Sequence, residues 1–294
     1  MLREYLVELF EPSLFLALLI GIVGVAAAAG MGRWNLLDAG LAVGGAFMAQ
    51  ASVNLINDYH DFTSGIDRES VKTRFSGGSA LVASGAVPHR DVLYLGIVSA
   101  AAAGIVGIYL AIAVTWLLLA LMGLGGIAIF LYTKYVTHFA FLAEPFVMLS
   151  FAAVAVGTYV AAHGSFAGMV PALFALLPAG MLGGLALLVN EVPDAEVDGR
   201  HGRRHAVVLL RDLRKVTLYF ALLEILIYGI VLAGVLARAL SPFFVLVLLA
   251  LPFTLYVGRG ILRFRDAPSY ERIMTVNVGG TLLFLGALIA SYSL

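Results

Sequence analysis

Residues 36–56 read LLDAGLAVGGAFMAQASVNLI and are followed at once by NDYHD, residues 57–61. The first stretch holds one charged side chain, Asp38, among 21 residues, whereas the second holds two carboxylates in five residues. A helix that crosses the hydrocarbon core of a bilayer needs roughly 20 mainly apolar residues. This part of the chain therefore predicts a membrane-spanning helix that ends in a polar cluster.

Similar apolar stretches occur along the whole chain. Strict alternation of apolar and polar residues, the pattern of a membrane barrel, is missing, and lipid cannot satisfy an open backbone. We therefore predict an all-α polytopic membrane protein with nine transmembrane helices in one bundle. The predicted spans are Leu14–Gly30, Leu36–Ile56, Val92–Ile112, Thr115–Tyr132, Phe141–Ala161, Met169–Val189, Val216–Ala237, Pro242–Gly258 and Ile273–Ser293.

The composition agrees with a membrane protein. Of the 294 residues, 62% are hydrophobic and 12% are charged, with 18 basic and 18 acidic side chains, and the mean hydropathy is +1.00. Because soluble domains hold about 25% charged residues, this excludes a water-soluble enzyme, a disordered chain and a DNA-binding module. Cysteine is absent, which excludes disulfides, thiolate metal sites and cysteine nucleophiles. The acidic N-terminal segment predicts no cleaved signal peptide.

The basic residues predict the orientation of the chain. Sixteen of the 18 lie in alternate connections, and only Arg33 and Arg238 lie in the others. By the positive-inside rule we expect an integral protein of the cell membrane, with the N-terminus in the cytoplasm and the C-terminus outside. Residues 1–294 then form a single membrane domain, with cytoplasmic cap loops near 57–91 and 190–215.

Two clusters of acids and amides lie at predicted cytoplasmic helix ends. Residues four apart stack on one face of a helix, which would align each cluster, and Gly65 would let the first helix end. Oxygen ligands of this kind suit Mg²⁺, which binds one or two carboxylates together with water and substrate phosphate. The candidate ligands are Asn57, Asp58, Asp61, Asp67, Asn190, Asp194 and Asp198.

Basic residues follow both acidic clusters. Carboxylate-bound metal together with arginine or lysine is a recurrent way to hold a diphosphate and to stabilise its charge as it leaves. The pattern therefore indicates a diphosphate site at the cytoplasmic end of the bundle. The candidate diphosphate ligands are Arg68, Lys72, Arg74, Arg203 and Arg204.

Three other features have simpler structural interpretations. Gly123-Leu-Gly125-Gly126 lies inside a predicted span without a preceding strand, so it predicts close helix packing rather than a dinucleotide site. Glu224 lies within the seventh span and predicts a hydrogen-bond partner inside the bundle, with a proton relay as the alternative. The histidines at 138, 201 and 205 do not have the spacing of a zinc site.

The two acidic motifs resemble those of a known family. Asn57-Asp58-x-x-Asp61 with Asp67, and Asn190-x-x-x-Asp194-x-x-x-Asp198, are similar to the two motifs of the UbiA superfamily of intramembrane prenyltransferases. The long step from Asp61 to Asp67 resembles the dihydroxynaphthoate polyprenyltransferase branch of the menaquinone pathway. The usual small-Lys-Arg-Thr after the second motif is replaced by Gly202-Arg-Arg-His205, a departure from that branch.

The resemblance implies a reaction and roles for individual residues. Two Mg²⁺ ions would hold an allylic polyprenyl diphosphate, with Asp61 and Asp194 as catalytic residues and with Tyr132 and Lys134 near the diphosphate. The isoprenyl group would pass, through an allylic cation, to an aromatic quinone precursor such as dihydroxynaphthoate. An alternative acceptor is geranylgeranylglyceryl phosphate of archaeal-type ether lipids, and a secondary transporter is the alternative from another class. The expected partners are the donor, the acceptor and membrane lipid, without nucleic acid.

Overall fold

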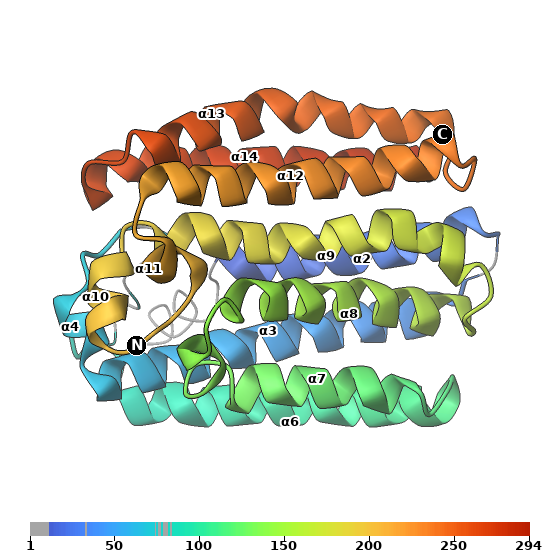
Figure 1. The fold of residues 1–294 in the computed structure, drawn as a ribbon. Helices are drawn as coiled ribbons and strands as arrows, with labels where there is room; N and C mark the ends of the chain where they lie inside the picture. The colour runs from blue at the N-terminus through green and yellow to red at the C-terminus, as the bar shows by residue number, and fades with distance from the viewer. Residues whose placement is uncertain (1–11, 33, 74, 76–77, 79–81, 83) are drawn as a thin grey trace.

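The computed structural model describes residues 12–294 except 33, 74, 76–77, 79–81 and 83. Within these residues all regular structure is helical, and the long helices run side by side while three short helices, α4, α10 and α11, lie at one end (Figure 1). The long helices are α2 (Pro12–Gly30), α3 (Leu36–Ser64), α6 (His89–Ala113), α7 (Leu118–Phe130), α8 (Ala143–His163), α9 (Met169–Glu191), α12 (Leu213–Leu236), α13 (Leu251–Leu262) and α14 (Ala267–Ser291).

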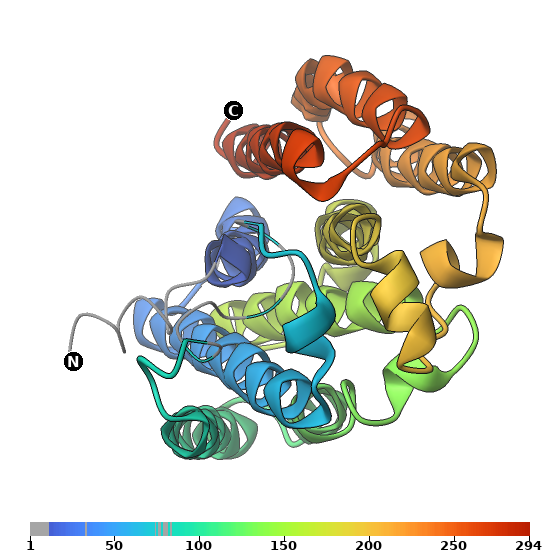
Figure 2. The same cartoon turned by 90° about the vertical axis from the view of Figure 1, so that its left-hand side faces the viewer.

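The short helices are α4 (Ile66–Glu69), α10 (Ala195–Arg200), α11 (Ala206–Leu210) and the 3₁₀ helices η1 (Val136–His138) and η2 (Pro242–Ala250). Viewed along the bundle, α4, α10 and α11 lie over its near end (Figure 2). We call this end of the bundle the polar end. Both acidic motifs are brought to this end because α3 and α9 each finish there, the first motif lying in the last turns of α3 and the second beginning in the last turn of α9.

Eight helices of the described chain are long and apolar enough to cross a membrane, and η2 continues into α13 to form one of them. The predicted fourth span, Thr115–Tyr132, corresponds to α7, which is a helix of 13 residues. Thr115, Trp116 and Leu117 lie in turns and bends before it, and residues 131–135 form turns after it. An all-helical protein of the integral membrane class is confirmed, whereas the structure gives eight full-length spans rather than nine.

Helix α3 is longer than its apolar run. It begins at Asn35, whose side-chain oxygen accepts hydrogen bonds from the backbone N–H of Leu37 at 2.9 Å and of Asp38 at 3.2 Å. It continues to Ser64 and ends at Gly65, where φ is +87°. The left-handed backbone conformation at this position favours glycine, because glycine has no Cβ that would clash there. The predicted helix end at Gly65 is therefore confirmed, and the whole of Asn57–Asp61 is helical.

The second motif does not form one continuous helix, so its predicted alignment on one face was wrong. Helix α9 ends at Glu191, residues 192–194 form turns, and α10 begins at Ala195. Val192 keeps helical angles (φ −59°, ψ −48°), but Pro193 has no backbone N–H to continue the helical hydrogen bonding, which gives the physical reason for the break. Asn190 therefore lies on α9, whereas Asp198 lies on α10.

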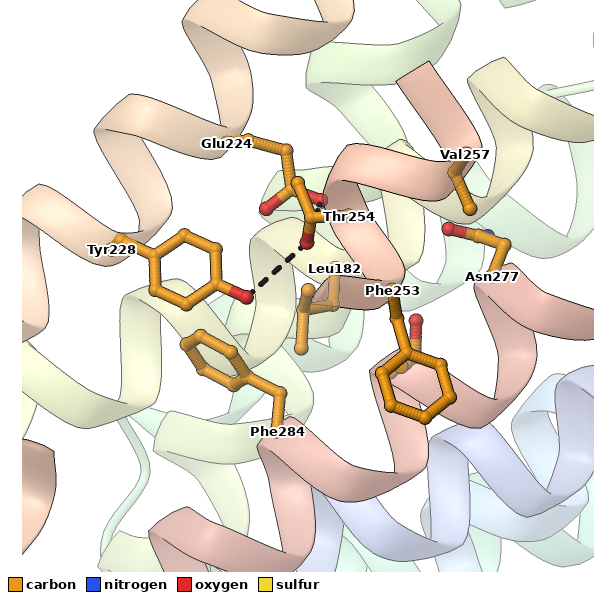
Figure 3. Close-up of a pocket in the computed structure, with 10 residues that line it drawn as sticks. Leu182, Glu224, Tyr228, Phe253, Thr254, Val257, Asn277 and Phe284 are labelled. Carbon is orange, nitrogen blue, oxygen red and sulfur yellow. Dashed lines mark hydrogen bonds between the residues drawn. The ribbon is translucent and has the colours of Figure 1, made fainter. Parts of the chain in front are cut away.

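Glu224 lies inside the bundle, as the sequence predicted. Its carboxylate accepts a hydrogen bond from Thr254 Oγ1 at 3.1 Å, and the Tyr228 hydroxyl lies 3.2 Å from the same Thr254 oxygen. Figure 3 shows Glu224 and Tyr228 of α12 turned towards Thr254 of α13, beside a cavity of about 10 Å³. The role of a hydrogen-bond partner inside the bundle is thus confirmed, and it fastens α12 to α13.

Candidate active site

A single arginine joins the two acidic motifs at the polar end. Arg203, in the segment between α10 and α11, forms an ion pair through Nη2 with Asp61 of α3, and its Nη1 lies 3.1 Å from Asp198 Oδ1. Both carboxylates are buried, at 6% and 3% exposure. Burial opposes the charge of Arg203, but the two carboxylates outweigh it and raise the pKa of the guanidinium. The two motifs therefore face each other across one buried cation.

The first motif is held in place by the turns after α7. Asn57 Nδ2 donates to Asp61 Oδ2 at 3.2 Å, and Asn57 Oδ1 accepts from Thr133 Oγ1 at 2.7 Å. The neighbouring Tyr132 stacks on Phe146 of α8 with ring centroids 6.0 Å apart. Burial, assisted by the charge of Glu191, raises the pKa of Tyr132 well above its ordinary value. Its phenol is therefore kept as a hydrogen-bond donor at the edge of the site.

Asp67 on α4 adds a third buried carboxylate to the polar end. Its Oδ1 lies 3.7 Å from Lys72 Nζ, and its Oδ2 has no hydrogen-bond partner in the described residues. Burial and the neighbouring Asp61 raise the pKa of Asp67 to about 6. A Cβ at Gly78, where φ is +72°, would overlap the Asp67 carboxylate. Glycine is thus required at 78 because the loop passes directly over this carboxylate.

An exposed set of contacts fastens the two motif segments together at the surface. Glu69 of α4 pairs with Arg200 of α10 at 3.1 Å and with His201 at 3.1 Å. Arg200 also pairs with Glu196 at 2.8 Å. Solvent screens exposed ion pairs of this kind, so they orient the loops more than they stabilise the fold.

The other predicted residues lie around this core with different surroundings. Asp58 is buried on α3, and Asp194 is the N-cap residue of α10. Arg68 is exposed and lies over the Phe62 ring at 5.7 Å, and Lys134 is exposed and lies over the Tyr135 ring at 5.4 Å. Two further predicted residues complete the set: Arg204 is exposed while its backbone N–H bonds to Thr137, and Arg74 lies outside the described residues.

Sequence reasoning missed three buried residues beside the second motif. Glu144 in the first turn of α8, Glu191 at the end of α9 and His205 before α11 lie together behind Asp198. The one sequence signal for this cluster was Glu144, an acid at the start of an apolar run. A charged side chain there costs free energy unless it has a partner, so the sequence indicates that a partner exists. Nothing in the local spacing links these positions.

An apolar groove runs along α3, α6, α7 and α8. Its volume is about 330 Å³, and small residues such as Ala46, Gly104 and Gly126 line it. The predicted close helix packing at Gly123-Leu-Gly125-Gly126 was wrong, because a Cβ at any of these three glycines would meet no atom within 4 Å. Gly125 and Gly126 leave the groove open, and Ala49 in its wall lies two turns before Asn57 on α3.

This geometry agrees with what comparison with known proteins shows. The UbiA prenyltransferase family matches residues 15–288. The chain belongs to the UbiA prenyltransferase family. A similar curated relative, 1,4-dihydroxy-2-naphthoate octaprenyltransferase of Bacillus subtilis (strain 168), is 30% identical over 250 residues, which are 82% of this chain and 76% of the relative. The protein is therefore an enzyme of the UbiA prenyltransferase family.

Solved structures show the same UbiA fold. The apo structure of a UbiA homologue from Aeropyrum pernix K1 superimposes with a TM-score of 0.74 at 18% identity, covering 96% of this chain and 98% of that one. A UbiA homologue from Archaeoglobus fulgidus bound to DMAPP and Mg²⁺ gives a TM-score of 0.57 at 14% identity, covering 95% and 96%. The helical bundle with a polar end is thus the architecture of this family.

Proposed function

We propose that this UbiA-family enzyme transfers an isoprenyl group from an allylic polyprenyl diphosphate to an aromatic quinone precursor such as dihydroxynaphthoate. The observation that carries the proposal is the joining of two acidic motifs through Arg203 at the polar end, beside an apolar groove of about 330 Å³. A diphosphate needs cationic partners, whereas an isoprenoid tail needs an apolar channel. The name of the Bacillus relative supports the aromatic acceptor.

The residues at the polar end fit Mg²⁺. Asp61 and Asp198 already share one cation, and the buried Asp67 Oδ2 has no partner in the described residues. In our proposal two Mg²⁺ ions, when bound, neutralise the diphosphate and ease its departure. The Archaeoglobus homologue bound to DMAPP and Mg²⁺ supports this cofactor. The proposed ligands are Asn57, Asp58, Asp61 and Asp67 from the first motif, and Asn190, Asp194 and Asp198 from the second.

The chain's own cationic groups would bind and orient the diphosphate. Arg203 is fixed between both motifs, and Lys72 reaches the first motif through Asp67. Arg68, Arg74 and Arg204 are proposed as outer contacts that close over the bound donor. Tyr132 keeps a phenolic proton and Lys134 carries a charge on the turns after α7, so both are proposed to contact the leaving group.

In the proposed reaction the allylic C–O bond breaks and the diphosphate leaves with the electron pair. A ring carbon of the acceptor attacks the allylic cation and forms the new C–C bond, and its proton then passes to a carboxylate or to the released diphosphate. Water would capture the cation, so the loops over the polar end and the apolar walls of the groove have to exclude it. The segments 57–91 and 190–215 are proposed as this cap of the single membrane domain.

We also propose an orientation for the bundle. Helix α7 would serve as a ninth, short span. The strong bias of basic residues supports an orientation with the polar end and the N-terminus in the cytoplasm. Soluble acceptors could then reach the site directly, while the tail of the donor stays in the membrane.

The experiment that tests the function is an Mg²⁺-dependent transfer assay with purified protein and radiolabelled geranylgeranyl diphosphate. Dihydroxynaphthoate and geranylgeranylglyceryl phosphate are offered in parallel, with EDTA as the control. We expect EDTA-sensitive label in the naphthoate product. Label in the glyceryl phosphate product alone would replace the acceptor with the archaeal-type lipid, and no transfer to either acceptor with donors of several lengths would contradict the proposed function.

The Arg203→Ala variant tests the proposed diphosphate contact. A hydrogen bond to a charged group contributes about 1.5–3 kcal/mol, so we expect the KM for the donor to rise on the order of 10–100-fold, with a smaller fall in kcat. The measurement is the initial transfer rate against donor concentration. An unchanged KM would contradict the role. Arg203→Lys keeps the charge but not the two-pronged geometry, so its KM for the donor should lie between those of the wild type and Arg203→Ala.

A further inference from the structure

Three buried side chains converge behind the second motif from segments that are far apart in the sequence. They are Glu144 on α8, Glu191 on α9 and His205 at the N-terminus of α11, with exposures of 0%, 7% and 1%. Each offers one atom that can bind a metal ion, and these atoms all lie within 4.8 Å of one another. We call these residues the buried triad.

Hydrogen bonding leaves part of the triad without a partner. Glu144 Oε1 accepts from the backbone N–H of Ala206 at 2.7 Å, while Glu144 Oε2 has no hydrogen-bond donor in the described residues. His205 Nε2 lies 3.0 Å from Asp198 Oδ2, and its Nδ1 lies 3.3 Å from Glu191 Oε2. The fully buried Glu144 oxygen and the imidazole Nδ1 thus point into the same small space.

The histidine has the environment of a metal ligand. A histidine that binds a metal generally donates its second ring N–H to a carboxylate, which fixes the tautomer and raises the basicity of the ligating nitrogen. Asp198 lies 3.0 Å from Nε2 and is such a carboxylate, so in the tautomer that carries its proton on Nε2 the Nδ1 lone pair faces the triad. Two buried carboxylates that face each other also require a neutralising cation or proton, because burial of uncompensated charge is costly.

From this geometry we propose that the buried triad binds one divalent transition-metal ion, such as Zn²⁺, in addition to the Mg²⁺ of the proposed reaction. Two carboxylate oxygens and one imidazole nitrogen suit Zn²⁺ and its first-row neighbours, whereas Mg²⁺ prefers oxygen ligands alone. Ligand atoms bound at about 2.0–2.2 Å in a tetrahedral site lie roughly 3.3–3.6 Å from one another. His205 Nδ1 and Glu191 Oε2, which are 3.3 Å apart, already have this spacing. Water completes the coordination.

The ion would act as a structural link. It links the ends of α8 and α9 that lie at the polar end to the segment that carries Arg203. Through His205 it also holds Asp198 in place. Its presence does not depend on prenyl transfer. Metal binding and the proposed reaction can therefore be tested separately.

The test uses purified full-length protein in detergent, stripped with chelator and then titrated with Co²⁺ in excess Mg²⁺. Visible absorption reports the coordination of Co²⁺, and metal analysis after gel filtration reports the stoichiometry. We expect about one Co²⁺ per chain with bands of a low-coordinate nitrogen–oxygen site, displaced by Zn²⁺. Glu144→Gln and, independently, His205→Asn are expected to lower the bound metal at least about tenfold.

Asp61→Ala serves as the matched control, because it removes a carboxylate of the proposed Mg²⁺ site and leaves the triad intact. This variant is expected to keep its Co²⁺ and its spectrum. The proposal is overturned if the wild-type chain retains less than about a tenth of an ion after Co²⁺ or Zn²⁺ loading, or if Glu144→Gln binds as much metal as the wild type. The first outcome would mean that the two glutamates share a proton instead.

Discussion

The Asp61→Ala protein is expected to lose prenyl transfer almost completely, by on the order of 10²–10³-fold or more in kcat, because loss of a single preorganised charge-stabilising group can cost that much. Asp61 interacts with three residues of the proposed site. It accepts a hydrogen bond from Asn57, forms an ion pair with Arg203, and its charge raises the pKa of Asp67. Its removal takes away a proposed metal ligand and leaves Arg203 with one carboxylate. The measurement is single-turnover formation of the labelled product at saturating Mg²⁺.

A matched control lies on the same helix. Asp38 is in the first turn of α3, at the opposite end from Asp61, so Asp38→Ala removes the same group from the same helix without touching the site. We expect transfer within about twofold of wild type for this control, because it loses only a small helix-dipole interaction. Gel filtration in detergent shows whether both variants remain folded. A folded Asp61→Ala protein with substantial Mg²⁺-dependent activity would contradict the metal assignment.

The second large effect is expected from filling the groove. Gly126 lines it, and a Cβ there would meet no atom within 4 Å. Gly126→Leu therefore places a side chain in the proposed tail channel without a clash in the free protein, and it improves the helix propensity of α7. Overpacking a bound tail costs about 1–3 kcal/mol, so transfer from geranylgeranyl diphosphate should fall on the order of 10–100-fold. Dimethylallyl diphosphate, with its short tail, should be affected far less.

Gly123→Leu is the control for this prediction. Gly123 lies one turn away on the same helix and is exposed, it also has open space at its Cβ, and it does not line the groove. Helix propensity and added volume are therefore the same in both variants, and the difference is that position 126 lines the groove whereas position 123 does not. The measurement is the ratio of rates with long and short donors. Equal ratios in Gly126→Leu, Gly123→Leu and wild type would show that the tail lies elsewhere.

The predicted fold was correct where the local sequence of one helix is sufficient to determine its structure. Apolar runs and the glycine at 65 correctly predicted α3 and its end, and the hydropathy of each run predicted its membrane class. The errors came from places where turns interrupt an expected helix. Pro193 breaks the second motif, and α7 is shorter than its apolar run because its flanking residues form turns. Gly123, Gly125 and Gly126 predict close helix packing, although a Cβ at any of them would meet no atom within 4 Å.

The sequence alone determined the membrane class, the helical architecture and the two acidic motifs, because hydropathy and helical periodicity act over a few turns of one chain. Only the tertiary structure decided which charges meet. Asp61 and Arg203 are 142 positions apart, and Glu144 and Ala206 are 62 apart. Such contacts follow from the packing of helices that are separately stable in lipid, and local spacing carries no information about that packing. The buried triad and the open groove could therefore be found only after the helices were placed side by side.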